Sequence, residues 1–212
     1  MTRATEFQQV LLVEGKTDLH VVLALCQQYH VTENFDIRDC DGISRLLRHL
    51  SLLLTNPSNI KTIGIIIDAD NDMKARLDQI RNVLSPYGYL VPKALSNTGL
   101  VCSSSLAMYP KMGLWLMPDN VNMGMVEDFA ISLVSPVDEL MMEAENELLH
   151  IEQRGINRYP KSHRSKAKIH TYLAWQSEPG MPIGLSVTQK VLDSNHPIAK
   201  SFVQNWLIPL FQ

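Results

Sequence analysis

The sequence predicts an α/β fold with a mostly parallel sheet and helices on both faces. Three short apolar runs support this, at 10–13, 62–67 and 113–117, because strands buried on both faces are continuously hydrophobic. Stretches with helical spacing lie between the runs. Such alternation is typical of parallel strands joined by right-handed crossovers.

The expected elements alternate in type along the first half of the chain. The first strand ends at Glu14, and a helix follows towards His30. The later elements are a strand at 35–40, a helix at 43–54, a strand at 62–67, a helix at 73–84 and a fourth strand at 113–117. Segment 90–109 has little periodicity, so we expect a loop or small hairpin there. In a doubly wound sheet these strands take the order 2-1-3-4.

The second part of the chain is predicted to be helical. Ser135-Pro136 resembles an N-cap followed by proline at the first helical position, and Gly155 stands where such a helix would end. Asn195-His196-Pro197 repeats the device before a C-terminal apolar stripe. We therefore expect a sheet domain at 1–135 and a helical extension packed on it at 136–212.

Composition restricts the class of protein. The 212 residues are 45% hydrophobic and 19% charged, as in ordinary soluble globular proteins. No apolar run approaches the roughly 20 residues that span a bilayer, so we expect a cytoplasmic protein without membrane contact. The three widely spaced cysteines provide neither a disulfide framework nor a CxxC zinc motif. The net charge of −3 means that binding to nucleic acid would need a local basic patch or bound metal.

Carboxylates follow two strands that the expected order makes neighbours. Glu14 ends the first strand, and Asp68, Asp70 and Asp72 follow the third, with Asp18 one turn beyond Glu14. The carboxyl ends of such strands flank the crevice where doubly wound sheets bind ligands. If strand conformation persists, the three alternating aspartates point to one side.

Five carboxylates in one crevice repel one another unless a proton or cation neutralises them. Hard oxygen ligands suit Mg²⁺, Mn²⁺ or Ca²⁺. One or two such ions can bind phosphate oxygens and activate water, so phosphoryl transfer is the natural chemistry.

Several of these residues also have an ordinary structural interpretation. Asp72 could cap the helix that begins near Met73, and Asp18 suits any helix N-terminus. Glu127 and Asp128 could line the same crevice or simply begin a helix. Gly15-Lys16-Thr17 is not a phosphate-binding P-loop, because the required first glycine is replaced by Val10.

A basic stretch lies at 154–168, with no acidic residue inside it. It is either a solvated loop after a helix or a contact surface for nucleic-acid phosphates. The candidate nucleic-acid-binding residues are Arg158, Lys161, Arg164, Lys166 and Lys168.

The motifs resemble those of TOPRIM domains. Glu14-Gly15 after one apolar strand and Asp68-x-Asp70 after another match the signature, and Glu14 to Asp18 has the EGxxD form of OLD-like nucleases. The continuation 115–120, with Gly124 and Glu127-Asp128, is similar to a small bacterial TOPRIM family of unknown function. The resemblance covers roughly residues 8–135 and implies a TOPRIM-like (Rossmann-like) sheet.

The resemblance also implies roles. Glu14 would be a metal ligand or proton-transfer group and Asp68 a catalytic metal ligand, with Asp70 and either Asp18 or Asp72 helping to hold one or two Mg²⁺ (or Mn²⁺) ions. OLD-type nucleases use a downstream lysine, for which Lys166 is our candidate, although Lys161 and Lys168 fall in the same region.

The expected activity is magnesium-dependent hydrolysis of DNA or RNA, and a separately encoded ATPase is a candidate partner. The alternatives are a non-catalytic or partner-dependent module that binds metal and nucleic acid, and a phosphotransferase or nucleotidyltransferase.

Overall fold

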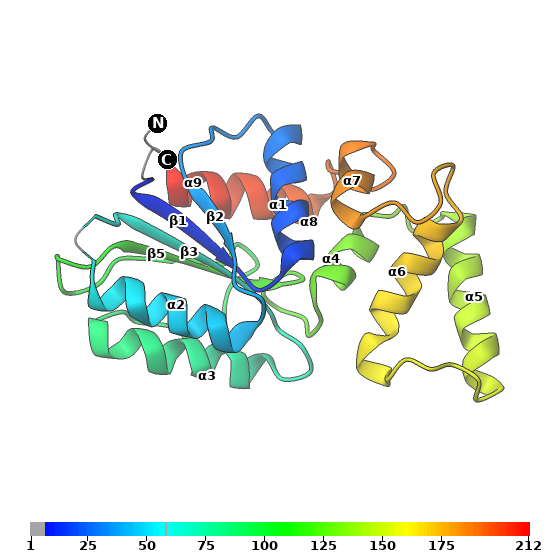
Figure 1. The fold of residues 1–212 in the computed structure, drawn as a ribbon, viewed down its shortest axis with the longest axis horizontal. Coiled ribbons are helices and arrows are strands. Elements are labelled where there is room, and N and C mark those ends of the chain that lie inside the picture. Colours follow the sequence, from blue (N-terminus) through cyan, green and yellow to red (C-terminus); the bar gives the residue numbers. More distant parts are fainter. Residues whose placement is uncertain (1–6, 58) are drawn as a thin grey trace, which may run out of the picture.

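A computed structural model describes residues 7–57 and 59–212 and contains a five-stranded sheet (Figure 1). The strand order is β2-β1-β3-β5-β4, and the pairs β1–β2, β1–β3 and β3–β5 are parallel. The strands are β1 (Gln9–Val13), β2 (Asp36–Asp39), β3 (Thr62–Asp68), β4 (Leu100–Cys102) and β5 (Lys111–Met117). The predicted α/β class is confirmed.

The predicted strand order is incomplete at one edge. The four predicted strands take the expected order, with the predicted fourth strand as β5. Within the stretch expected to be a loop or hairpin, Leu100–Cys102 forms β4 and pairs antiparallel with β5. Three residues are too few for a periodic pattern, which explains why the sequence did not reveal this strand.

One face of the sheet is covered by α2 (Ile43–Thr55) and α3 (Met73–Leu84), which lie below the strands in Figure 1. α2 buries Leu46, Leu50 and Leu54, whose four-residue spacing forms one stripe along the helix. These leucines share a core cluster with the odd-numbered isoleucines of β3.

The opposite face is covered by α1 (Lys16–Gln28) and by the C-terminal helical stretch. That stretch consists of α8 (Pro197–Lys200), a π-helical segment η3 (Ser201–Leu207) and α9 (Ile208–Phe211). His196 caps α8 and Pro197 is its first residue, as the sequence predicted. The end of the chain is thereby part of the sheet's own core.

Two glycines allow this close approach. A Cβ on Gly113 would lie 2.3 Å from Leu210 Cδ2, and one on Gly64 would lie 3.0 Å from the same atom. Since neither contact leaves room for a side chain, the glycines let α9 lie directly on β3 and β5.

The remaining helices continue from the carboxyl end of β5, and α5 and α6 form an antiparallel pair away from the sheet (Figure 1). α5 begins at Glu139 and not at Ser135-Pro136, because the Asp138 carboxylate accepts the Met141 N–H at 2.9 Å and caps the helix there. Gly155 follows its end with φ +63°, as expected for a C-terminal glycine. These helices are α4 (Val126–Ser132), α5 (Glu139–Gln153), α6 (Arg164–Ala174) and α7 (Ile183–Thr188), with 3-10 turns at Ser85–Tyr87 and Lys161–His163.

In the part of the chain that the structure describes, no helix has both the length and the apolar character needed to cross a bilayer.

Candidate metal centre

The carboxyl ends of β1 and β3 bring Glu14 and Asp68 together. The two strands are parallel neighbours, with Val13 paired to Ile66. The Asp68 backbone N–H donates a hydrogen bond to Glu14 Oε2 at 3.2 Å. The Glu14 side chain therefore reaches across the strand end, as the predicted topology required.

Asp18 joins this pair from the first turn of α1. Its side chain is buried, with 3% of the residue exposed. Oδ2 accepts the Gly15 N–H at 3.1 Å, but Oδ1 is buried and has no hydrogen-bond partner among the described residues. A buried carboxylate oxygen without a donor is costly, so this atom points to a missing proton or cation.

Glu127 comes from the start of α4, beyond β5. The N–H of the preceding residue, Val126, donates to Asp68 Oδ1 at 3.0 Å, which fixes the helix start against the end of β3. Glu127 is 4% exposed, and its Oε1 lies 3.6 Å from Lys166 Nζ on α6. We call Glu14, Asp18, Asp68 and Glu127 the carboxylate cluster.

The electrostatics of the carboxylate cluster show how closely its members interact. Burial first, and then the charges of neighbouring carboxylates, raise the pKa of Asp68 to about 9. Burial also dominates at Asp18 and, with the charges of Glu14 and Glu127, raises its pKa to about 7. The pKa of Glu14 is raised mainly by burial, although the Asp68 N–H and the charge of Arg76 oppose the shift. The cluster therefore favours uptake of protons or of a cation.

Asp70 lies beside the cluster but is oriented differently from the prediction. β3 ends at Asp68, and Asp70 has φ +51°, so the expected strand alternation from Asp68 to Asp72 is wrong. The Asp70 backbone instead forms an antiparallel bridge to Gly124, and its carboxylate forms an ion pair with Arg76. Its charge still contributes to the raised pKa values of Asp68 and Glu14.

Asp72 and Asp128 have capping roles in the structure. The exposed Asp72 carboxylate accepts the Ala75 N–H at 2.9 Å at the start of α3. Asp128 Oδ2 accepts the Met125 N–H at 2.9 Å, and Oδ1 accepts the Ser165 hydroxyl. Neither Asp72 nor Asp128 belongs to the carboxylate cluster in the described conformation.

The basic stretch is divided between paired and exposed side chains. Arg164 contacts Glu145 at 2.6 Å and Glu152 at 2.9 Å, and Lys168 contacts Glu145 at 2.9 Å. The stretch has no acidic residue of its own, but α5 supplies acids that pair with it across the helix pair. Of the candidate nucleic-acid-binding residues, Arg158, Lys161 and Lys166 are exposed.

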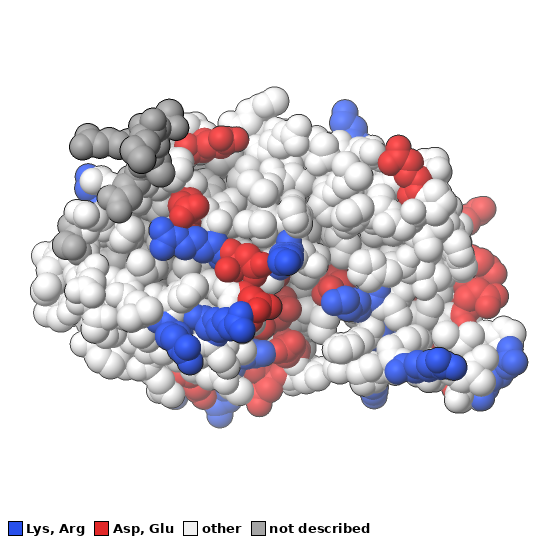
Figure 2. All heavy atoms as spheres, viewed as in Figure 1, with Lys and Arg blue, Asp and Glu red and all other residues white. Residues whose placement is uncertain are grey.

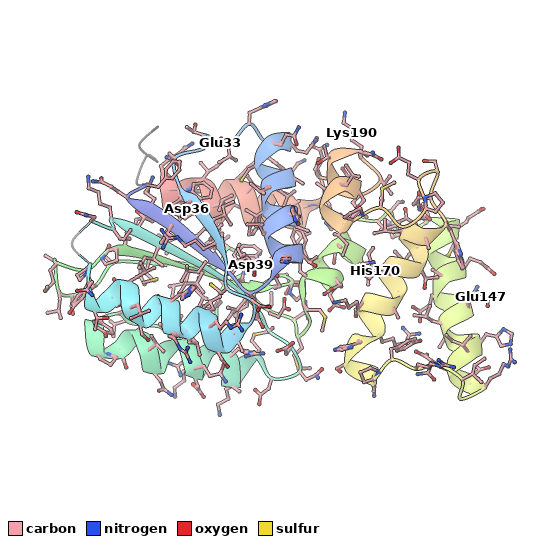
Figure 3. All side chains as sticks on the ribbon, viewed as in Figure 1. Glu33, Asp36, Asp39, Glu147, His170 and Lys190 are labelled. Carbon is pink, nitrogen blue, oxygen red and sulfur yellow. The ribbon has the colours of Figure 1, made fainter. Side chains whose placement is uncertain are left out.

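The candidate lysines differ in their positions. Lys166 is the one whose ammonium group lies next to the carboxylate cluster, and its side chain is 53% exposed. Lys168 is directed to α5, and Lys161 lies in the exposed turn before α6. Figure 2 shows acidic side chains gathered near the middle of one face with basic ones beside them, and Figure 3 shows Asp39 at the end of β2, at the same edge of the sheet.

The carboxylates do not converge on a common point. In residues 7–57 and 59–212, no three His, Cys, Asp or Glu side chains are arranged so that they could hold a metal ion as they stand. Glu14 and Asp68 accept backbone N–H groups, and Asp70 pairs with Arg76. The hard oxygen donors fit Mg²⁺ in kind, and rotation of these side chains would be needed for them to meet.

Arg76 was not among the site residues predicted from the sequence. The sequence does contain a signal for it, because an arginine in the first turn of a helix can fold back to the acidic strand end that precedes the helix.

The fold and the carboxylate cluster define an α/β protein with an acidic site at the strand ends. The chain belongs to the family described as "Protein of unknown function (DUF3226)", whose model matches residues 8–212. No curated protein matches it.

Similar solved structures come from the C-terminal region of the OLD protein of Xanthomonas campestris pv. campestris. The structure phased with mercury is 17% identical, with 95% of each chain covered and a TM-score of 0.49. The structure phased with iodine is 16% identical, with the same coverage and a TM-score of 0.48. Activity must therefore be inferred from the site itself.

Proposed function

We propose that this chain is a divalent-metal-dependent hydrolase of phosphodiester bonds in nucleic acid, of OLD-like TOPRIM type. The observation that carries the proposal is the buried Asp18 Oδ1, which lacks a donor within a cluster that also contains Asp68 and Glu127. At neutral pH, buried carboxylates this close together are stabilised by bound protons or by a cation.

Mg²⁺ or Mn²⁺ is the cation that suits these ligands. Asp18, Asp68 and Glu127 would hold the ion, with Glu14 as a further ligand or as the proton acceptor. When bound, the ion would supply Lewis-acid stabilisation of the phosphate and a water of lowered pKa.

The protein's own groups have separate tasks in this proposal. Glu14 would accept a proton from the attacking water, a task favoured by the raised pKa that burial gives its carboxylate. Lys166 would contact the phosphate and offset the negative charge that develops during bond breaking. Its position, 3.6 Å from Glu127 at the rim of the cluster, supports this role.

Binding of the nucleic acid would use the exposed members of the basic stretch. Arg158, Lys161 and Lys166 are exposed and would meet phosphates, whereas Arg164 and Lys168 are engaged by α5. Contacts of this kind position a backbone without reading its bases, so the proposal includes both DNA and RNA.

A non-catalytic or partner-dependent module is the second candidate. It is favoured by the fact that no three acidic, His or Cys side chains of the described residues already converge for a metal. A substrate or a separately encoded ATPase would then be needed to complete the site.

The testing experiment is cleavage of labelled plasmid DNA, single-stranded DNA and structured RNA with Mg²⁺ or Mn²⁺. We expect the wild type to cut in the presence of metal. Glu14→Gln and Asp68→Ala should each lower the cleavage rate by about 10²-fold or more, which is the order of magnitude that general acid–base catalysis contributes. Cutting that survives both substitutions would come from a contaminating nuclease. Binding of metal without any cutting would favour the second candidate.

A further inference from the structure

Arg76 occupies the Asp70 side of the acidic site. It lies in the first turn of α3, whose start is fixed by the Asp72 cap, and the Arg76 N–H donates to the Asp72 carbonyl at 3.1 Å. From there its guanidinium forms an ion pair with the Asp70 carboxylate. The Arg76 side chain is 17% exposed and that of Asp70 is 37% exposed, so the arginine is the more buried partner.

The position of Asp70 is fixed by its backbone. Its N–H donates to the Gly124 carbonyl at 2.8 Å, and the Gly124 N–H donates back at 2.9 Å. Gly124 has φ +140°, and a Cβ there would lie 2.6 Å from Asp128 Oδ2, so the bridge depends on a glycine. The Asp70 backbone is therefore held in place, and only its side chain can exchange one partner for another.

Asp70 and Arg76 act on the carboxylate cluster in opposite directions. The charge of Asp70 raises the pKa of Asp68 and Glu14, and the charge of Arg76 lowers that of Glu14. Both groups therefore lie within electrostatic reach of the positions that would hold a metal ion.

We infer that Arg76 is a built-in counter-cation for Asp70, so that a divalent ion binds at Asp70 only by displacing the Arg76 guanidinium. This inference rests on the proposed metal-dependent function. It makes Arg76 a residue that sets the number and order of bound ions, with the carboxylate cluster filled first and Asp70 second. An arginine is suited to this task because its guanidinium stays protonated and cannot yield the position by losing a proton.

The test is calorimetric titration of the metal-free protein with Mn²⁺, which reports stoichiometry and affinity without any catalytic turnover. In the wild type we expect one tighter event and a second, weaker one. In Arg76→Gln we expect the second event to become about tenfold tighter or more, since its competitor is removed. Lys74→Gln is the matched control, because it removes the same charge from an exposed position on the first turn of α3.

A second pair of variants locates the effect. Asp70→Asn introduced into the Arg76→Gln protein should abolish the second event, and Asp68→Asn should abolish the first. The inference is overturned if Arg76→Gln behaves like Lys74→Gln, or if its tighter event persists with Asp70→Asn. If the wild type binds an ion that Asp68→Asn loses while Arg76→Gln changes nothing, this inference alone fails. If neither wild type nor Arg76→Gln binds Mn²⁺, the proposed function fails with it.

Discussion

Asp68→Asn is expected to stabilise the metal-free protein at pH 8 while it abolishes activity. The Asp68 carboxyl is buried among other carboxylates, which raises its pKa to about 9. A carboxyl with a raised folded-state pKa binds more protons in the folded than in the unfolded protein. Folding therefore requires Asp68 to take up a proton, and the free-energy cost of this uptake grows as pH rises from the unfolded pKa near 4 towards the folded pKa.

The sign of the pH dependence follows directly. Wild-type stability should fall between pH about 4 and about 9, and the asparagine variant should lack this part of the fall. Asparagine keeps an Oδ1 acceptor for the Val126 N–H, so the local hydrogen bond is retained. We expect a Tm about 5 °C or more above wild type at pH 8, and no such gain at pH 4.

Thermal unfolding of metal-free protein over this pH range is the measurement. Asp72→Asn is the matched control, because Asp72 is exposed and asparagine caps a helix as well as aspartate does. Added Mg²⁺ should raise the Tm of the wild type by clearly more than that of Asp68→Asn, which lacks the first site. A variant destabilised equally at pH 4 and pH 8 would contradict the proposed pH-dependent cost of burying the Asp68 carboxyl.

Replacement of Lys166 should remove most of the cleavage while leaving the metal in place. Its ammonium group lies 3.6 Å from Glu127 Oε1, yet 53% of its side chain is exposed, so it can turn towards a bound phosphate. We expect Lys166→Gln to lower kcat by about 10²–10⁴-fold, the range found when a positioned charge or proton donor is lost. Binding of Mn²⁺ should be retained or tightened, since a positive charge beside the cluster is removed.

Lys161→Gln is the control for Lys166. Lys161 is exposed in the turn before α6 and carries the same charge, so its loss should raise KM modestly and leave kcat nearly unchanged. Lys166→Arg should recover part of the lost activity, because it restores the charge. Equal effects of Lys161→Gln and Lys166→Gln on kcat would assign Lys166 to general phosphate attraction.

Much of the fold was predictable because it is encoded in local patterns. The buried run before Glu14 and the run before Asp68 each marked a strand, and parallel pairing then placed their ends side by side. α3 has the predicted range, because the cap at Asp72 and the end before Ser85-Pro86 are both local signals. β4 escaped prediction because a three-residue edge strand takes its conformation from its partner β5.

The site was less predictable where it depends on contacts between distant elements. The sequence could not choose among three lysines, since the choice depends on how α6 lies against α4 and α5. Arg164 and Lys168 resembled phosphate-binding residues, but the acids that pair with them lie on α5. The positive φ of Asp70 likewise depends on its bridge to Gly124. No local sequence pattern predicts a contact between residues so far apart in the chain.

The most direct test of the central claim is anomalous diffraction from crystals of the protein soaked with Mn²⁺ at a pH near 8. The proposal predicts an anomalous peak bounded by carboxylate oxygens of Asp18, Asp68 and Glu127, with Asp18 Oδ1 among its ligands. A saturating soak that gives no peak there, or a peak only at other carboxylates, would contradict the assignment of this cluster as a metal centre.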